Sequence, residues 1–320
     1  MIYTTEQIEG VLQQYEKQKE ILENAGILST FRNGEKGIMG INGSFYVLPS
    51  LEEIRNRANN NREMLETKIG QGFTKLLLTP FGMSLNVLHE KVSDVILRHA
   101  NEGKFFATKK GPNDPDEKLI PLELNKNQPF WTWDKYKNAD INGTIIYGFT
   151  EFPQNVSASP VRFGTSQAVV SHQGKTKQEI LDSSSGGASA GWYISFIENI
   201  PNLPVEKEGK TIGERKQHEA NKSPVDYLSL LQTERMYANE EGITPEDWAI
   251  YFLSYLEETN QIVDDYEGVG NVSWNLGAYF PENSGVPTAC FVRSVNQVRV
   301  GSLGARYFGP VYCARTVVRI

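Results

Sequence analysis

Few side chains in this chain have the type and spacing that catalysis needs. Cys290 and Cys313 are its only cysteines among 320 residues, too few to cross-link a secreted scaffold, so we expect two reduced, buried thiols. Gly268-Val-Gly270 is too short for a dinucleotide-binding fingerprint, and it follows a predicted helix where that motif follows a strand. No P-loop occurs. These residues predict a protein without a catalytic centre or a bound cofactor.

The residues with metal-ligand chemistry are scattered or have a simpler explanation. His89-Glu90 lacks the second histidine that a zinc-binding helix carries one turn later, and the remaining histidines lie far apart: His99, His172 and His218. Asp264, Asp265 and Glu267 could hold calcium through carboxylate oxygens, but a solvated helix terminus is the simpler interpretation. We therefore predict no resident metal.

The segment from Ser284 to Ile320 has an unusual composition. It contains no Lys, Glu, Asp, Met or Trp, and its charged residues are all arginine: Arg293, Arg299, Arg306, Arg315 and Arg319. These arginines could pair with the acids at 264–267 around buried strands, or form a patch for an anionic ligand, because a guanidinium binds carboxylate or phosphate in two-point fashion. A third explanation is genetic, because codons of the form NNY encode no Lys, Gln, Glu, Met or Trp.

The overall charge and the apolar runs exclude two classes of partner. A formal net charge of −7 argues against general nucleic-acid binding, which needs clustered Lys and Arg. No apolar run approaches the roughly 20 residues that cross a bilayer, and the start of the chain lacks the basic and apolar regions of a signal peptide. We expect a cytoplasmic protein that binds neither membranes nor nucleic acid in general.

Residues 1–120 are predicted to form a helical N-terminal region. Thr4-x-x-Gln7 and Ser50-x-x-Glu53 have the form of capping boxes. Two apolar stripes at helical spacing follow, and the second ends near Gly103, a suitable C-cap: Ile8, Leu12, Tyr15, Ile21 and Leu22, then Leu85, Leu88, Val92, Val95 and Ile96. The stripes could pack inside the chain, which we favour, or against a second copy in a homo-oligomer.

Residues 121–320 read as an α+β domain. Strands are predicted at 144–149 and 192–197, where β-branched and aromatic residues gather. Ser223-Pro224 and Thr244-Pro245 each open a helix with a hydroxyl N-cap, proline at N1 and acids in the first turn. We expect two helices on a small, twisted, mostly antiparallel sheet.

The order of these elements resembles the variable proteins of diversity-generating retroelements. The resemblance rests on the two capped helices, the strand at 271–280, the Gly285-Val-Pro287 turn and the ending from Cys313 to Arg319. It implies a C-type-lectin-like fold of the formylglycine-generating-enzyme subclass over about residues 125–320. In that family, outward-facing positions near the C-terminus vary while the backbone stays fixed, which implies a ligand-binding protein with varied, protein ligands.

Carried over to this sequence, the resemblance makes residues 288–312 the variable segment and 314–319 an invariant closing strand. Gln297 cannot be NNY-encoded and is expected to be scaffold. Phe and Tyr on a rigid sheet offer large contact area at low entropic cost. The expected exposed contact positions are Cys290, Phe291, Arg293, Arg306, Tyr307, Phe308, Val311 and Tyr312.

Two other functions remain open. Formylglycine-generating enzymes hold copper(I) with a close pair of cysteines, so the resemblance also implies an oxidase if strands bring Cys290 and Cys313 together. A structural or interaction component of a virus or mobile element, assembling through the N-terminal helices, is the third alternative.

Overall fold

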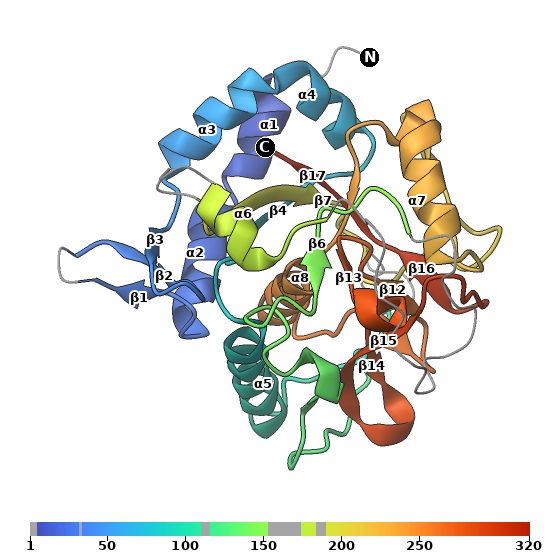
Figure 1. Ribbon diagram of the computed structural model, residues 1–320. Helices are drawn as coiled ribbons and strands as arrows, with labels where there is room; N and C mark the ends of the chain where they lie inside the picture. Colours follow the sequence, from blue (N-terminus) through green and yellow to red (C-terminus); the bar gives the residue numbers. More distant parts are fainter. Residues whose placement is uncertain (1–4, 32–33, 110–115, 153–173, 184–189) are drawn as a thin grey trace.

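The computed structural model describes residues 5–31, 34–109, 116–152, 174–183 and 190–320, which form a mixed α+β fold (Figure 1). The helices are α1 (Thr5–Leu12), α2 (Tyr15–Asn24), α3 (Leu51–Asn60), α4 (Arg62–Gly70), α5 (Leu85–Asn101), α6 (Lys177–Ser183), α7 (Pro224–Thr233) and α8 (Pro245–Thr259). Among the described residues, no helix is both long and apolar enough to cross a membrane.

The strands form several small sheets. They are β1 (Ser29–Thr30), β2 (Lys36–Met39), β3 (Phe45–Val47), β4 (Lys75–Thr79), β5 (Phe130–Thr132), β6 (Ile146–Tyr147), β7 (Tyr193–Ile197), β8 (Thr211–Ile212), β9 (Arg215–Lys216), β10 (Glu241–Gly242), β11 (Asp265–Tyr266), β12 (Val272–Trp274), β13 (Ala278–Tyr279), β14 (Gly285–Val292), β15 (Gln297–Gly304), β16 (Tyr312–Ala314) and β17 (Thr316–Arg319). The predicted strands at 144–149 and 192–197 correspond to β6 and β7.

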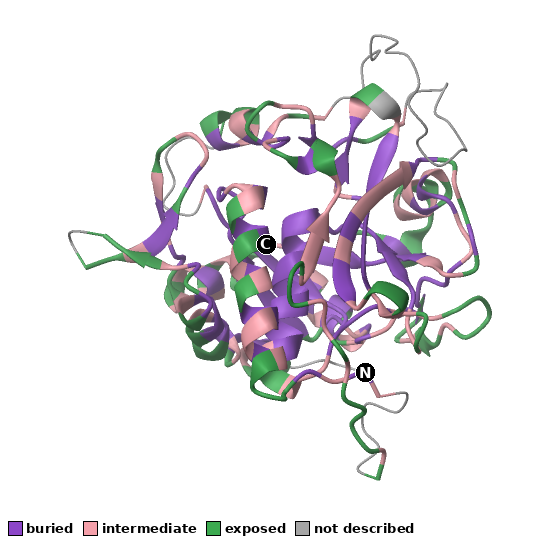
Figure 2. Ribbon diagram, turned by 90° about the horizontal axis from the view of Figure 1, so that it is seen from below, coloured by how far each residue is buried: buried purple, intermediate pink, exposed green. Residues whose placement is uncertain are grey.

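Helix α8 lies at the centre of the molecule, and residues 245–256 of it are all buried. Figure 2 shows it enclosed by the other elements. It packs against α2, α5, β4 and β14. Because every residue from 245 to 256 is buried, the helix is covered on all sides, and α8 organises the core.

The helix caps predicted from sequence are largely present. Ser223 with Asp226, and Thr244 with Asp247, form reciprocal capping boxes. The Ser50 hydroxyl accepts the Glu53 amide hydrogen at the start of α3. Gly103 adopts a φ of 70° directly after α5, the left-handed conformation expected past a helix C-terminus. The predicted cap at Thr4 lies outside the described residues.

The expected boundary near residue 120 does not separate two cores. One four-stranded sheet has the order β10-β17-β7-β4, so β4 from the N-terminal region pairs with β7 and completes a sheet with the C-terminal strand. Leu76 lies opposite Phe196, which lies opposite Val318. Buried residues from both sides of the boundary, from Ile8 to Val318, belong to one core cluster.

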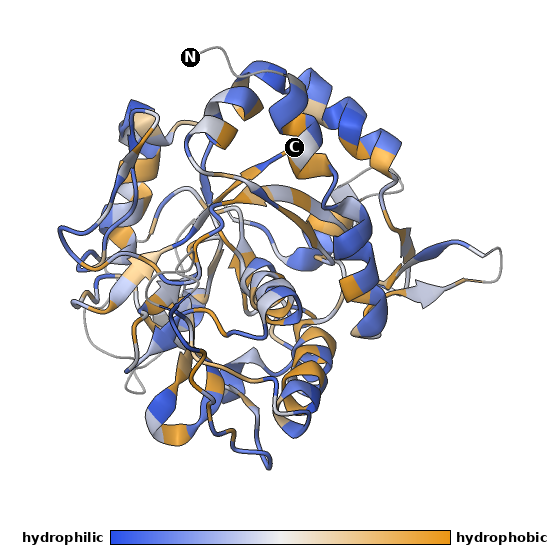
Figure 3. Ribbon diagram, turned by 180° about the vertical axis from the view of Figure 1, so that it is seen from behind, coloured by the Kyte–Doolittle hydropathy of each residue, from blue (hydrophilic) through white to orange (hydrophobic). Residues whose placement is uncertain are grey.

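The N-terminal stripes pack inside the chain, the alternative favoured from sequence. Ile8, Leu12, Ile21 and Leu22 are buried within this single chain, and the Ser254 hydroxyl donates to Gln18 where α2 meets α8. The outer sides of α3 and α4 are mostly hydrophilic, while the β1–β3 hairpin projects from the body (Figure 3). Homo-oligomerisation through these helices stays a prediction.

A second sheet carries most of the C-terminal segment. Its order is β16-β12-β14-β15-β5, with β11 added to β14. β14 and β15 form an antiparallel hairpin in which Cys290 lies opposite Arg299, whereas β5 runs parallel to β15 and β12 parallel to β16. The sheet is therefore mixed, and its edge strand β5 comes from a segment far away in the sequence.

A buried ion cluster ties three distant segments together. The Lys177 ammonium lies 2.8 Å from both Asp140 and Glu246, and all three side chains are fully buried. Tyr147 donates to Glu246 at 2.9 Å. Burial alone would lower the pKa of Lys177, but Glu246 and Asp140 hold it above its ordinary value. The cluster joins α6 to the first turn of α8.

Replacing Lys177 should destabilise the fold far more than replacing the exposed Lys175 two residues earlier. Lys177→Met leaves two carboxylates buried without their cation, and we expect a loss of about 3–5 kcal/mol in the free energy of unfolding. Urea denaturation measures it, with Lys175→Met as the control because Lys175 is exposed. Equal stabilities of the two variants would show that the cluster contributes nothing to folding.

Candidate functional site

One row of side chains crosses the six-stranded sheet on a single face. Tyr312 pairs with Val272, Cys290 with Arg299, and Arg299 with Trp131; the register of β12 on β14 brings Val272 opposite Cys290. Partners in a register point to the same face of a sheet. At about 4.8 Å between strands, this outer row spans roughly 19 Å.

The opposite face of the same strands belongs to the core. Ala289, Phe291, Val298 and Val300 alternate with the outer-row residues and are buried in the main cluster. The Phe291 ring meets the edge of Phe105 at 5.5 Å between centroids. The expectation that Phe291 is an exposed contact position is therefore wrong: its place in the alternation directs it inward.

Cys290 does point to the outer face, but it is only 5% exposed. In the row it lies between Val272 and Arg299, and these larger neighbours cover its short side chain. The expectation of an exposed contact is wrong for Cys290 also.

The β15–β16 loop adjoins this face at Tyr312 and carries a highly exposed ring. The Phe308 side chain is 62% exposed, the highest fraction among the large hydrophobic residues that the structure describes. Beside it, the Tyr307 ring meets the edge of Tyr312 at 5.2 Å, and Tyr312 packs on the buried Trp274 at 5.2 Å. Arg306 is exposed and Val311 half-buried. The loop thus presents aromatic rings on a packed base.

The other end of the row carries a cation–aromatic pair. The Arg299 guanidinium lies 4.1 Å from the centre of the Trp131 ring, within the range of a favourable cation–π contact. Neither residue was among the predicted contact positions. In the sequence, the apolar Val298 and Val300 on either side of Arg299 indicate that Arg299 points to the outer face of a strand. Nothing in the sequence near Trp131 indicates that its strand pairs with β15.

We define the outer surface as the row residues Trp131, Arg299 and Tyr312 together with four exposed or half-buried residues of the adjoining β15–β16 loop: Arg306, Tyr307, Phe308 and Val311. Beyond it, the same face of the sheet is covered by a second core cluster that includes Trp274, Tyr279, Val286 and Tyr227. The outer surface is therefore what that cluster leaves uncovered.

Three of the five C-terminal arginines pair with buried acids. Arg293 binds Asp265 through two hydrogen bonds of 2.7 and 2.5 Å, and Arg315 binds Asp264 through bonds of 3.0 and 2.6 Å. The Arg319 guanidinium lies 2.6 Å from Asp247. The predicted pairing with the acids at 264–267 is thus confirmed for Arg293 and Arg315, whereas Arg319 pairs with an acid of α8 instead. Arg293, expected as a ligand contact, is instead committed to a two-point ion pair.

These pairings also use the acids suggested for calcium. Burial raises the pKa of Asp264 even though Arg315 opposes it. Within the described residues, no group of three metal-ligating side chains gathers in one place.

The two cysteines do not form a joint site. Cys313 pairs with Ser273, and Ser273 pairs with Ala289, so the Cys313 and Ala289 side chains lie on the same face of the sheet. Cys290 follows Ala289 in strand β14 and therefore points to the opposite face. Burial raises the pKa of both thiols, that of Cys313 to about 12. The copper(I) alternative requires both thiolates at one point, and this register separates them.

One further motif was missed in the sequence. Gly187, Ser189 and Gly191 have the Gly-x-Ser-x-Gly spacing of a nucleophile elbow, although Ser189 lies outside the described residues. An elbow follows a strand and opens a helix, whereas here strand β7 begins two residues after Gly191. The spacing alone therefore does not indicate a hydrolase.

Comparisons of the chain with protein-family models, with curated proteins and with solved structures found no match. The fold and the outer surface by themselves define the class of this protein. It is a mixed α+β protein whose sheet presents aromatic and arginine side chains on its outer face.

Both thiols should resist modification in the native protein. Their burial and raised pKa leave little accessible thiolate at neutral pH, so we expect 5,5′-dithiobis-(2-nitrobenzoate) to label neither cysteine until denaturant is added, and then to label both. Rapid labelling of one equivalent without denaturant would contradict the buried position of that cysteine.

Proposed function

We propose that the chain is a ligand-binding protein whose outer surface recognises a protein ligand. The observation that carries the proposal is that hairpin β14–β15 turns one apolar face into the core, while Arg299 on its other face lies in one row with Trp131 of β5 and Tyr312 of β16. Tyr, Trp and Arg dominate recognition surfaces because they bury large area at low entropic cost. A paired hairpin backbone lets the outer residues change without disturbing the core.

We further propose that the scaffold is C-type-lectin-like and that the chain is a variable protein of a diversity-generating retroelement. Two observations support this. The outward residues Arg299, Tyr307, Phe308 and Tyr312 are all NNY-encodable. Gln297, which is not, is buried, and its amide donates to the Gln128 carbonyl at 3.0 Å, the position of a framework residue.

The distribution of variation among natural copies of the gene tests this proposal. We expect substitutions in the codons of outward residues between 288 and 312, and invariance at Phe291, Val298 and Val300, because these three fill the core. Sequencing the last hundred or so bases in a source population, with a search for a near-identical template repeat and a reverse transcriptase, measures it. Variation spread equally over inward and outward codons, or no variation and no template, would overturn the retroelement proposal.

The scaffold and surface roles also predict opposite effects of two phenylalanine truncations. Phe308→Ala should change the free energy of unfolding by no more than about 0.5 kcal/mol, because the ring is exposed. Phe291→Ala should cost about 3–5 kcal/mol, because it leaves a cavity in the core. Chemical denaturation distinguishes them. A comparable loss for Phe308→Ala would place that ring in the core and remove it from the outer surface.

A further inference from the structure

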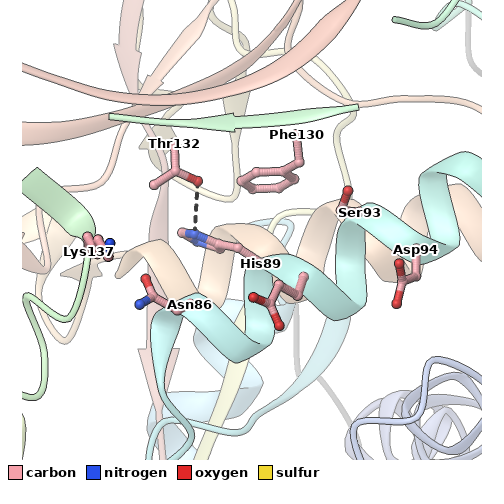
Figure 4. A pocket seen from close by; sticks show the side chains of 8 residues that line it. Asn86, His89, Ser93, Asp94, Phe130, Thr132 and Lys137 are labelled. Atoms are coloured by element: carbon pink, nitrogen blue, oxygen red, sulfur yellow. Dashed lines mark hydrogen bonds between the residues drawn. The ribbon is translucent and has the colours of Figure 1, made fainter. Parts of the chain in front are cut away.

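A separate pocket lies between α5 and β5 (Figure 4). Its volume is about 320 Å³, at the lower end of the range for small-molecule sites. Helix α5 supplies one wall, β5 supplies Phe130 and Thr132, and Lys137 closes one end; the residues from α5 are Asn86, His89, Glu90, Ser93 and Asp94. None of these residues belongs to the outer surface.

The pocket has a rigid, uncharged floor. The His89 and Phe130 rings stack at 4.7 Å between centroids, and His89 Nδ1 lies 3.4 Å from the Thr132 hydroxyl. His89 is 5% exposed, and its Nε2 atom has no hydrogen-bond partner among the residues that the structure describes. Burial lowers the pKa of His89 to about 4, so the imidazole is neutral at pH 7. Such a floor offers apolar contact, because its one unpartnered polar atom, His89 Nε2, is itself buried.

The charged side chains around this floor have no ion-pair partner among the residues that the structure describes. Glu90 and Asp94 lie one turn apart on the same side of α5, and two like charges at this spacing destabilise a helix. Within the described parts of the chain, neither carboxylate forms an ion pair, and neither does the Lys137 ammonium. A bound cation would relieve the repulsion between the two carboxylates.

The charges are spread along the pocket, with Lys137 at one end, Asp94 at the other and Glu90 between them. In Figure 4, Lys137 is beside Asn86 at one end, and Ser93 and Asp94 lie at the other. The eight steps along the helix from Asn86 to Asp94 span roughly 12 Å at a rise of about 1.5 Å each. The ends are therefore far enough apart for a short chain with a charge at each end.

We propose that this pocket binds a small zwitterion with an amine at one end and a carboxylate at the other. The amine lies between Glu90 and Asp94, and the carboxylate contacts Lys137 and the Asn86 amide. The methylene chain between them lies on Phe130. The proposal does not depend on the outer surface or on any retroelement.

Three probes of one chain length test the class of ligand. 6-Aminohexanoate carries both charges, hexylamine only the amine and hexanoate only the carboxylate. Isothermal titration calorimetry with the full chain should show saturable binding of 6-aminohexanoate, and each single-charge probe should bind roughly tenfold more weakly or worse, because it loses one charge-assisted contact. No saturable binding of 6-aminohexanoate at about 10 mM, or equal affinity for all three probes, would overturn the proposal.

Variants then assign the ends. Combining Glu90→Gln with Asp94→Asn should weaken 6-aminohexanoate binding by roughly tenfold or more, and Lys137→Met should reduce it to the level of hexylamine. Glu52→Gln is the matched control, since it removes an exposed carboxylate on α3 and should leave the affinity unchanged. The affected residues lie at the surface, so circular dichroism should show unchanged unfolding. An unaltered affinity in the Glu90 and Asp94 double variant would also refute the site.

Discussion

The buried acids at the start of α8 are the constraint on which the rest of the structure depends. Glu246 and Asp247 are adjacent, and both are fully buried. A carboxylate without a partner in the core costs several kcal/mol, so each needs a cation or donors from elsewhere in the chain. Lys177 of α6 serves Glu246, and Arg319 of β17 with Thr79 of β4 serves Asp247. The first turn of α8 thus links segments from three regions of the sequence.

The same helix extends this system into the C-terminal sheet. The Trp248 indole donates to Asp264 at 2.8 Å, and Asp264 also receives Arg315, which in turn donates to the Pro201 carbonyl. The Trp248 indole, the Asp264 carboxylate and the Arg315 guanidinium thus all meet complementary groups, which makes the interior specific as well as apolar. The last strand is held at one end by Arg319 and preceded by Arg315, so the final residues are structural rather than ligand-facing.

The two candidate sites share one short strand. In β5, Phe130 and Thr132 face α5 and line the pocket, while Trp131 faces outward and stacks with Arg299. Period-two alternation sends neighbouring residues of a strand to opposite faces. A three-residue strand at the edge of the sheet therefore contributes to two surfaces with different chemistry, an aromatic and cationic one outside and a mixed-charge pocket beside α5.

Local features of the fold were predictable from the sequence, because their hydrogen bonds close within three or four residues. The capping boxes at Ser223 and Thr244 are of this kind, as is the C-cap at Gly103. The composition of the C-terminal segment also pointed to arginines that pair with the acids at 264–267. What these signals cannot give is the face on which a residue of a β-rich segment lies. That face depends on register, and a shift of one residue exchanges core and surface.

Tertiary structure therefore decided the site. It placed Phe291 in the core, buried Cys290 between its neighbours in the outer row, paired Arg293 with Asp265, and brought Trp131 beside Arg299 from a segment far away in the chain. It also joined strand β4 of the N-terminal region to β7 in the sheet that contains the C-terminal strand β17, although the sequence suggested a domain boundary near residue 120. The sequence by itself determined where the capped helices begin, at Ser50, Ser223 and Thr244, and where α5 ends, since capping is local. The pairing of distant strands was decided only when the whole core closed around α8 and its buried acids.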